Sequence, residues 1–277
     1  MPTPGSIRAP ILAIMLFQVA ALFVRAFVET NLIDNGESAS YAKDFSYLVV
    51  PPILLVLLFP VLRQHRHFLI SLIRRHDLTL RLVLCSILLG VALRASYWGG
   101  LVSLISFGVL SNSDPQAVVG PVLRFGCPDS AVLTVSFLVM SLLIPATEEA
   151  INRGLIIHTL IARGRIPALV LSSALFAIVH DPQAILVAFL GGLFLGMQVI
   201  NHRTLWAPLF THAAYNAVAV IDSECISAQW NPVEMTDSIV GTGLIASALA
   251  VVGLALSILL VMQKETGAHE RPDVSRS

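Results

Sequence analysis

Long hydrophobic runs, separated by short charged segments, recur along almost the whole chain. A helix needs about 20 apolar residues to cross a bilayer, so each run is a candidate membrane span. The candidate spans are residues 9–28, 45–62, 82–110, 130–162, 166–180, 184–201, 204–221 and 239–262. Gly99-Gly100 interrupts the third run, and Pro145 is expected to kink the overlong fourth.

The loops between these runs alternate in charge. One set is basic and consists of Arg63, Arg66, Arg74, Arg75 and Arg81 with a single acid, Asp77, followed by Arg163 with Arg165 and then Arg203. The other set is mainly acidic and contains Glu29, Asp34, Glu37, Asp44, Asp222, Glu224, Glu234 and Asp237. Arginine-rich loops face the cytoplasm, and the alternation requires residues 82–110 to cross once. We therefore expect an all-α polytopic bundle of about eight helices in the cell inner membrane, with both termini cytoplasmic.

Composition supports lipid as the solvent of this chain. Only 12% of its 277 residues are charged and 56% are hydrophobic, whereas soluble domains carry about 25% charged residues. Seventeen basic and 17 acidic residues cancel, so no nucleic-acid partner is indicated. The N-terminal run lacks a small-residue cleavage site and is interpreted as a first span, not a signal peptide. The polar tail from Lys264 is expected to be disordered.

The three cysteines, Cys85, Cys127 and Cys225, have no CxxC spacing. Cys127 and Cys225 both fall in predicted outer loops. They are either a disulfide formed in an oxidising compartment or two unrelated thiols. The loop histidines His65, His67 and His76 are interpreted as solvated.

Polar side chains inside the hydrophobic spans cluster in the second half of the chain. Such groups are costly in lipid and are usually functional. Three stretches carry them: LLIPATEEAINRGLI with Glu148, Glu149 and Arg153, SSALFAIVHDP with Phe176 and His180, and LWAPLFTHAAYNAVAV with His212 and Asn216. Each stretch contains a pair four residues apart, which shares a helix face. Glu148 lies about 100° around its helix from Glu149, so the two carboxylates are expected to have different partners.

Helical rise gives the expected depth of these groups. Glu148 precedes the Arg163–Arg165 turn by 15 residues, and His180 follows it by 15. At 1.5 Å per residue both lie roughly 22 Å from that turn. His212 follows the next basic turn by only nine residues, so it is expected to lie about 10 Å shallower.

Each stretch taken alone also has a purely structural interpretation. Thr147 followed by two glutamates suits a helix start after Pro145. A membrane histidine can serve as an interhelical hydrogen-bond partner, and Arg94 in the third span is interpreted as a structural or interfacial charge. The ordered combination of the three stretches favours a functional site.

The motifs are EExxxR at 148–153, FxxxH at 176–180 and HxxxN at 212–216, in that order in successive helices. This set resembles the CPBP family, which includes CAAX-processing endopeptidases of the Rce1 type and bacteriocin-processing or Abi membrane proteins. The resemblance covers roughly residues 128–222. It divides the chain into N-terminal transmembrane helices (1–127), a catalytic core (128–222), and an outer loop with the last span and the tail (223–277).

The resemblance implies roles for four catalytic residues. Glu148 is the general base that activates water, and His180 orients that water. His212 and Asn216 form the oxyanion site. These residue types suit amide hydrolysis, which needs a base and donors aimed at the developing oxyanion.

Three further residues have implied supporting roles: Glu149 and Arg153 pair to fix the glutamate helix, and Phe176 lies beside His180. The resemblance implies that no metal or other cofactor is needed. The alternative is a zinc ion held by Glu148, Glu149, His180 and His212.

The implied function is an intramembrane glutamic-type endopeptidase that cuts a peptide or a membrane-anchored protein within the lipid bilayer. His180 precedes the Asp181-Pro182 turn on the predicted outer side, which favours exported substrates and C-terminal processing or sorting. One rival is a non-proteolytic scaffold, immunity or regulatory protein of the same fold. Another is a proton-coupled transporter, which would predict inverted repeats. The sequence assigns neither an oligomeric state nor a role for the first three helices.

Overall fold

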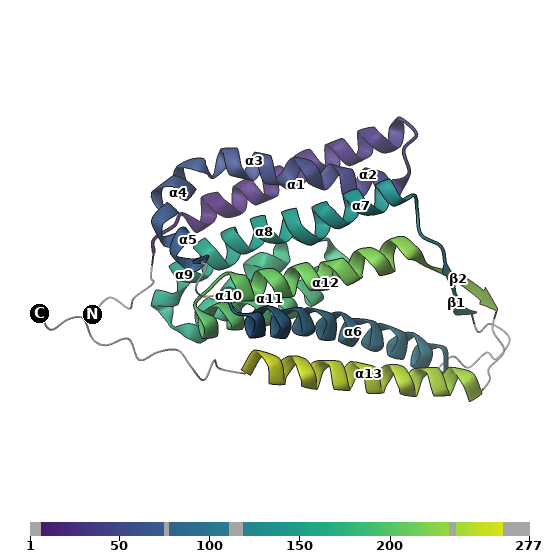
Figure 1. Cartoon of the computed structure of the whole chain (residues 1–277). Coiled ribbons are helices and arrows are strands. Elements are labelled where there is room, and N and C mark those ends of the chain that lie inside the picture. Colours follow the sequence, from purple (N-terminus) through teal and green to yellow (C-terminus); the bar gives the residue numbers. More distant parts are fainter. Residues whose placement is uncertain (1–6, 75–77, 111–118, 233–236, 263–277) are drawn as a thin grey trace, which may run out of the picture.

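A computed structural model describes residues 7–74, 78–110, 119–232 and 237–262. It shows an elongated bundle of helices with a two-stranded ribbon at one end (Figure 1). The elements of the first part are α1 (Ile11–Asp34), α2 (Ala39–Ser46), η1 (Tyr47–Val49), α3 (Val50–Leu57), α4 (Phe59–Gln64), α5 (Arg66–Leu72) and α6 (Leu80–Leu110). Next come β1 (Val119–Phe125), α7 (Ser130–Leu138), η3 (Val139–Leu143), α8 (Ile144–Glu149), η4 (Ala150–Ile156), α9 (Ile157–Leu160) and η5 (Ile161–Arg163). The last are α10 (Arg165–Ile178), η6 (Pro182–Ala184), α11 (Ile185–His202), α12 (Trp206–Cys225), β2 (Ile226–Pro232) and α13 (Asp237–Met262).

Within the described residues, five helical segments are long and apolar enough to cross a membrane. They are Ile11–Asp34, Leu80–Leu104, Ser130–Arg163, Pro182–His202 and Gly243–Met262. The helical membrane fold is therefore confirmed, whereas the count of about eight spans is not.

Three expected spans differ from a long apolar helix for local reasons. The run 45–62 is divided into short helices, because prolines stand at the first turns of both α3 and α4. Helix α10 has only 14 residues. Helix α12 is 20 residues long but carries polar residues along its length, His212, Asn216 and Asp222 among them.

The long third span is one continuous helix, α6, and Gly99-Gly100 does not break it. Gly99 instead allows close packing, since a Cβ there would lie 2.6 Å from the Ala250 nitrogen of α13. The approach is reciprocal, since a Cβ on Gly253 of α13 would lie 2.9 Å from the Ala92 carbonyl of α6. Small residues of this kind let membrane helices approach backbone to backbone. Gly90 packs in the same way against α12, at the Thr211 carbonyl.

The fourth span runs from Ser130 to Arg163 and contains two π-helical segments, η3 and η4. Pro145 follows the first segment at the start of α8. Its missing N–H removes one hydrogen bond of the helix, which accounts for the irregular turn before it. Such π-helical turns are common at functional sites.

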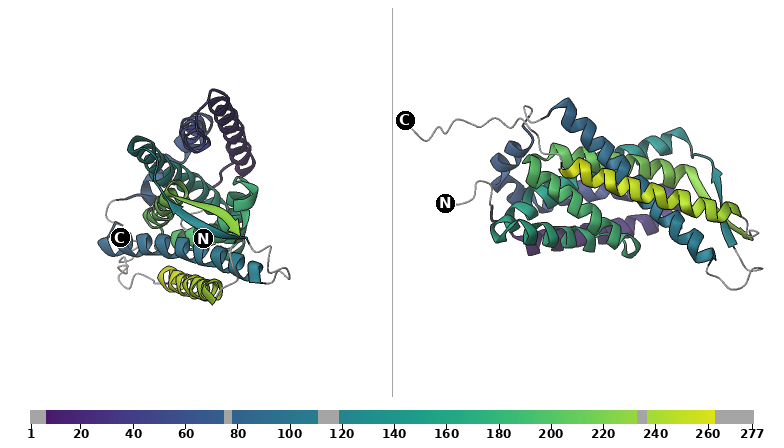
Figure 2. Two further views of the ribbon diagram at one scale, coloured as in Figure 1. Left: turned by 90° about the vertical axis from the view of Figure 1, so that its right-hand side faces the viewer. Right: turned by 90° about the horizontal axis from the view of Figure 1, so that it is seen from below.

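The N-terminal helices form a layer on one side of this irregular span, opposite α6 and α13 (Figures 1 and 2). Ile14 of α1, with Leu54 and Leu58 from the α3–α4 segment, belongs to one buried apolar cluster with Ile144 and Leu155. The layer thus packs directly on the helix that carries the glutamates.

Hydrogen bonds between segments show which loops share an end of the bundle. Near the start of the chain, Ala9 N donates to Thr159 Oγ1 at 3.1 Å. Leu205 N donates to the Leu72 carbonyl at 2.8 Å, and Asn201 Nδ2 donates to the Val261 carbonyl at 3.0 Å. The start of α1 and the end of α13 therefore lie at the end that carries the basic turns. The tail from Lys264 lies outside the described residues.

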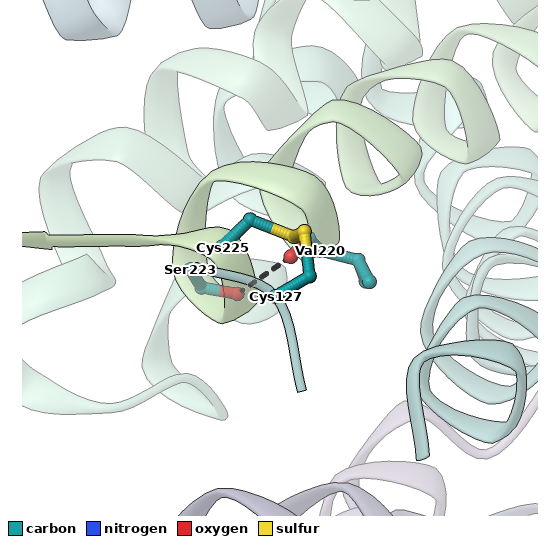
Figure 3. Close-up of a disulfide and its surroundings, with 4 residues drawn as sticks. All are labelled: Cys127, Val220, Ser223 and Cys225. Carbon is teal, nitrogen blue, oxygen red and sulfur yellow. Dashed lines mark hydrogen bonds between the residues drawn. A yellow bond between two sulfur atoms is a disulfide. The ribbon is translucent and has the colours of Figure 1, made fainter. Parts of the chain in front are cut away.

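At the opposite end, β1 and β2 pair antiparallel from Val119↔Pro232 to Phe125↔Ile226. A disulfide joins Cys127 and Cys225 (Figure 3), next to the end of the ribbon at which Phe125 pairs with Ile226. Of the two interpretations of these cysteines, the structure confirms the disulfide. It ties the segment before α7 to the last residue of α12. The ribbon itself was not expected from the sequence.

Candidate active site

Three helical segments bring the three motifs together. The two glutamates end α8 and Arg153 follows in η4. His180 stands two residues beyond the end of α10. His212 and Asn216 lie on α12.

Glu149 is at the centre of a buried ionic network. Its Oε1 lies 2.8 Å from Nδ1 of His212, and its Oε2 lies 3.3 Å from Nε of Arg153. The Glu149 side chain is 0% exposed and that of Arg153 is 2% exposed. The expected pair of Glu149 and Arg153 is present, and the carboxylate also holds the catalytic-motif histidine.

Glu148 approaches the same imidazole from its other nitrogen. Its Oε2 lies 3.8 Å from Nε2 of His212. The expectation that the two carboxylates have different partners is therefore wrong, because one ring with two nitrogens lies between both of them. They still differ in accessibility, since the Glu148 side chain is 23% exposed.

The same contact corrects the expected depth of His212. Its ring lies at the level of Glu148, whereas the estimate from a helical rise of 1.5 Å per residue put it about 10 Å shallower. The seven residues of η4 lie between Glu148 and the Arg163 turn. A π-helix has more residues per turn than an α-helix, so the distance along the axis from Glu148 to the turn is shorter than the α-helical estimate.

Phe176 connects the remaining motif residues. Its ring centroid lies 4.5 Å from that of His180 and 6.0 Å from that of His212. The Arg153 guanidinium lies over the same ring, 4.1 Å from its centroid, in a cation–π contact. Phe176 is thus in ring contact with both histidines.

The backbone fixes the orientation of the His180 ring. Its Nδ1 lies 2.8 Å from the Phe176 carbonyl. A carbonyl oxygen only accepts, so Nδ1 carries the proton and Nε2 of the neutral ring is an acceptor. Among the contacts of the described residues, His180 forms neither an ion pair nor a hydrogen bond with Glu148.

Asn216 has a partner that the motif does not reveal. Its Nδ2 donates to the Met140 carbonyl at 2.8 Å. Met140 is five residues before Pro145, and the missing proline N–H leaves carbonyls of this π-helical turn without a helical donor. His212 and Asn216 were expected to point into one space, but each makes its own contact with the glutamate-bearing span.

Two polar residues near the site were not singled out in the sequence. Asn152 is fully buried, and its Nδ2 donates to the Glu148 carbonyl at 2.9 Å. Arg25 of α1 approaches Asp181, the neighbour of His180, with Nη2 to Oδ1 at 3.8 Å, and covers the Tyr47 ring. Arg25 could have been recognised from the sequence, because it is a charged residue within the first hydrophobic run.

Arg94 has its counter-charge on α12. Its Nε and Nη2 donate to both oxygens of Asp222, at 2.7 and 2.5 Å. Nη1 donates to Tyr215 Oη at 3.2 Å, and Trp98 Nε1 also donates to Asp222. The structural interpretation of Arg94 agrees with this network, which joins α6 to the helix that carries His212.

The zinc alternative requires several ligands around one point. Within the described residues, no group of three or more His, Cys, Asp or Glu side chains is arranged to hold a metal ion. Chelation of the purified protein tests this alternative.

Comparison with known proteins gives one match. Residues 130–218 match the family model described as "Rce1-like: Type II CAAX prenyl endopeptidase Rce1-like". No curated protein and no solved structure matches the chain. The matched segment contains the glutamate, arginine and both histidine positions described above. Residues 130–218 of this chain are therefore similar to the Rce1-like family of CAAX-type endopeptidases.

Proposed function

We propose that this protein is an intramembrane endopeptidase in which Glu148 activates a water molecule. The observation that carries the proposal is the contrast between the two glutamates. Glu149 is completely buried between Arg153 and His212, whereas Glu148 keeps 23% of its side chain exposed next to the same histidine. A reacting carboxylate needs access to water and substrate, and a positioning carboxylate does not.

Each proton in the proposed reaction has a defined path. Glu148 takes one proton from water, and the resulting hydroxide oxygen attacks the carbonyl carbon of the scissile amide. The tetrahedral intermediate then collapses, the C–N bond breaks, and Glu148 returns its proton to the leaving nitrogen. His180 accepts a hydrogen bond from the same water through Nε2, because Nδ1 is bound to the Phe176 carbonyl.

The oxyanion donors follow from the same hydrogen bonds. Because the Glu149 carboxylate accepts from His212 Nδ1, a neutral ring carries its proton there and has none on Nε2. His212 therefore serves as an oxyanion donor in its protonated form, in which Nε2 also carries a proton. Asn216 uses one N–H on Met140, and its second N–H is the other donor.

For the substrate we propose a peptide or a membrane-anchored protein, with exported proteins processed or sorted near the C-terminus as the favoured class. The basic end of the bundle would face the cytoplasm of a cell whose inner membrane holds the protein. His180 precedes the Asp181-Pro182 turn at the opposite end of α10 from the basic Arg165. This position supports a cut in the outer half of the bilayer.

The test is cleavage by purified protein in liposomes, with substrates chosen from membrane proteins that accumulate uncut when the gene is deleted. Wild type is expected to cut, and His180→Ala and His212→Ala are expected to fold and lose activity. If both variants cut like wild type, the two histidines are not catalytic. If purified wild type cuts nothing while both variants restore processing in cells, the scaffold interpretation replaces the protease. If a strong chelator abolishes cleavage and zinc restores it, the same residues are metal ligands.

A further inference from the structure

A second polar feature lies outside the catalytic network, at the basic end of the bundle. A surface pocket of about 590 Å³ is lined by Phe59, Pro60, Arg63, Gln64, Arg66 and His67. All six residues belong to α4 and α5, which meet at a break in the helix at His65. Its volume is in the range of small-ligand sites, about 300–1,000 Å³.

The pocket is positively charged without compensation. No acidic residue occurs between Asp44 and Asp77 in the sequence, and among the described residues neither Arg63 nor Arg66 has an ion-pair partner. Arg66 Nε donates to His67 Nε2 at 3.2 Å, so this nitrogen accepts and His67 is neutral in that arrangement. Two guanidinium groups therefore share one open pocket, although their like charges repel each other.

Apolar side chains adjoin the pocket on both sides along the chain. Val56 is 73% exposed and Ile70 is 57% exposed, and each is three residues from a pocket-lining residue. Phe59 of the pocket wall is itself exposed. A ligand with an anionic head and an apolar tail matches a basic pocket with such borders.

The position of the pocket agrees with that ligand. The end of α5 contacts the α11–α12 turn through Leu72 and Leu205, at the end of the bundle where the arginine-rich turns gather. In the orientation that the basic turns predict, this end faces the cytoplasmic lipid headgroups. We propose that the Arg63–Arg66 pocket binds the phosphate headgroup of an anionic phospholipid, with its acyl chains along the flanking apolar residues.

The experiment compares lipid retention by the full-length protein in detergent, measured by native mass spectrometry. Phosphatidylglycerol and phosphatidylcholine with identical acyl chains are the probes. Wild type is expected to retain phosphatidylglycerol selectively. In the double variant Arg63→Gln/Arg66→Gln, the ratio of retained phosphatidylglycerol to phosphatidylcholine is expected to fall roughly fivefold for each arginine removed. Gln64→Glu, which adds a negative charge to an intact pocket, is expected to lower it as well.

The matched control is Arg163→Gln/Arg165→Gln, which removes the same charge from exposed positions at the same end of the bundle but outside the pocket. It is expected to retain the wild-type selectivity. Equal losses in both double variants would mean diffuse surface charge and would overturn the proposal, as would an absence of selectivity in wild type. Displacement of the lipid by inorganic phosphate alone would assign the pocket to a soluble anion instead.

Discussion

His212 Nδ1 and Glu149 Oε1 lie 2.8 Å apart across the interface between α12 and the glutamate-bearing span. This bond determines which ring nitrogen faces Glu148, and it joins two motifs that are 63 residues apart. It also gives the two adjacent glutamates separate tasks, because Glu149 holds the ring and Glu148 faces its other nitrogen.

Neutralising each glutamate is therefore expected to have different effects on stability. Glu149→Gln leaves the buried Arg153 without its counter-charge, and breaking a buried pair in this way costs about 3–5 kcal/mol. Glu148→Gln removes a partly exposed charge and is expected to unfold close to the wild-type temperature. Thermal unfolding of both variants in one detergent measures the difference. Equal unfolding temperatures would contradict the central position of Glu149 in the network.

The ion pair of Arg94 and Asp222 is expected to stabilise the contact of α6 with α12. Asp222→Asn leaves a mostly buried guanidinium, 13% exposed, without its counter-charge, at a cost of about 3 kcal/mol, the lower end for a buried pair. Tyr215→Phe removes only one hydrogen bond from Arg94 and is expected to cost about 1 kcal/mol. Chemical unfolding of the two variants measures these costs. The pair would be of little importance if Asp222→Asn were no more harmful than Tyr215→Phe.

Two glycines of α6 offer a matched test of helix packing. A methyl group on Gly90 would clash with the Thr211 carbonyl and lie 2.9 Å from the Tyr215 nitrogen, whereas one on Gly100 has nothing within 4 Å. Gly90→Ala is expected to cost about 1–3 kcal/mol by overpacking and to slow cleavage by moving α12. Gly100→Ala is expected to be neutral or to stabilise by about 0.5–1 kcal/mol. Unfolding temperature and cleavage rate are the measurements, and similar behaviour of the two variants would argue against this packing.

The disulfide closes a loop between residues 98 positions apart. Alkylation of the denatured protein is expected to modify two additional cysteines after reduction. Cys127→Ser/Cys225→Ser is expected to lose about 2–4 kcal/mol of stability, and reductant is expected to affect wild type but not this variant. Identical alkylation with and without reduction would show that the bond does not form.

The sequence predicted the helical fold with long apolar helices better than the geometry of the candidate site. Hydrophobic length is a local property, so α6 and the long glutamate-bearing span were recognisable. Helical spacing likewise predicted the contacts of Glu149 with Arg153 and of Phe176 with His180. These pairs lie within one helical turn.

Contacts between segments were not predictable in this way. The pairing of Asn216 with the Met140 carbonyl depends on a π-helical turn before Pro145 that has no simple sequence signature. The depth of His212 was wrong because it depends on how α12 packs against the glutamate-bearing span, which the count of residues from each turn ignores; η4 accounts for only part of the difference. The Arg94–Asp222 pair requires the packing of α6 on α12, which is a tertiary property.

The most direct test of the account is the cleavage rate of Glu148→Gln, normalised to folded protein, beside wild type in buffer containing a strong chelator. A general base contributes about 10²–10⁴-fold to a rate. If Glu148 is the general base, wild type keeps its full rate with the chelator, and well-folded Glu148→Gln cuts at least 100-fold more slowly than wild type. Cleavage by Glu148→Gln within a few fold of wild type, or loss of wild-type activity that only zinc restores, would contradict it.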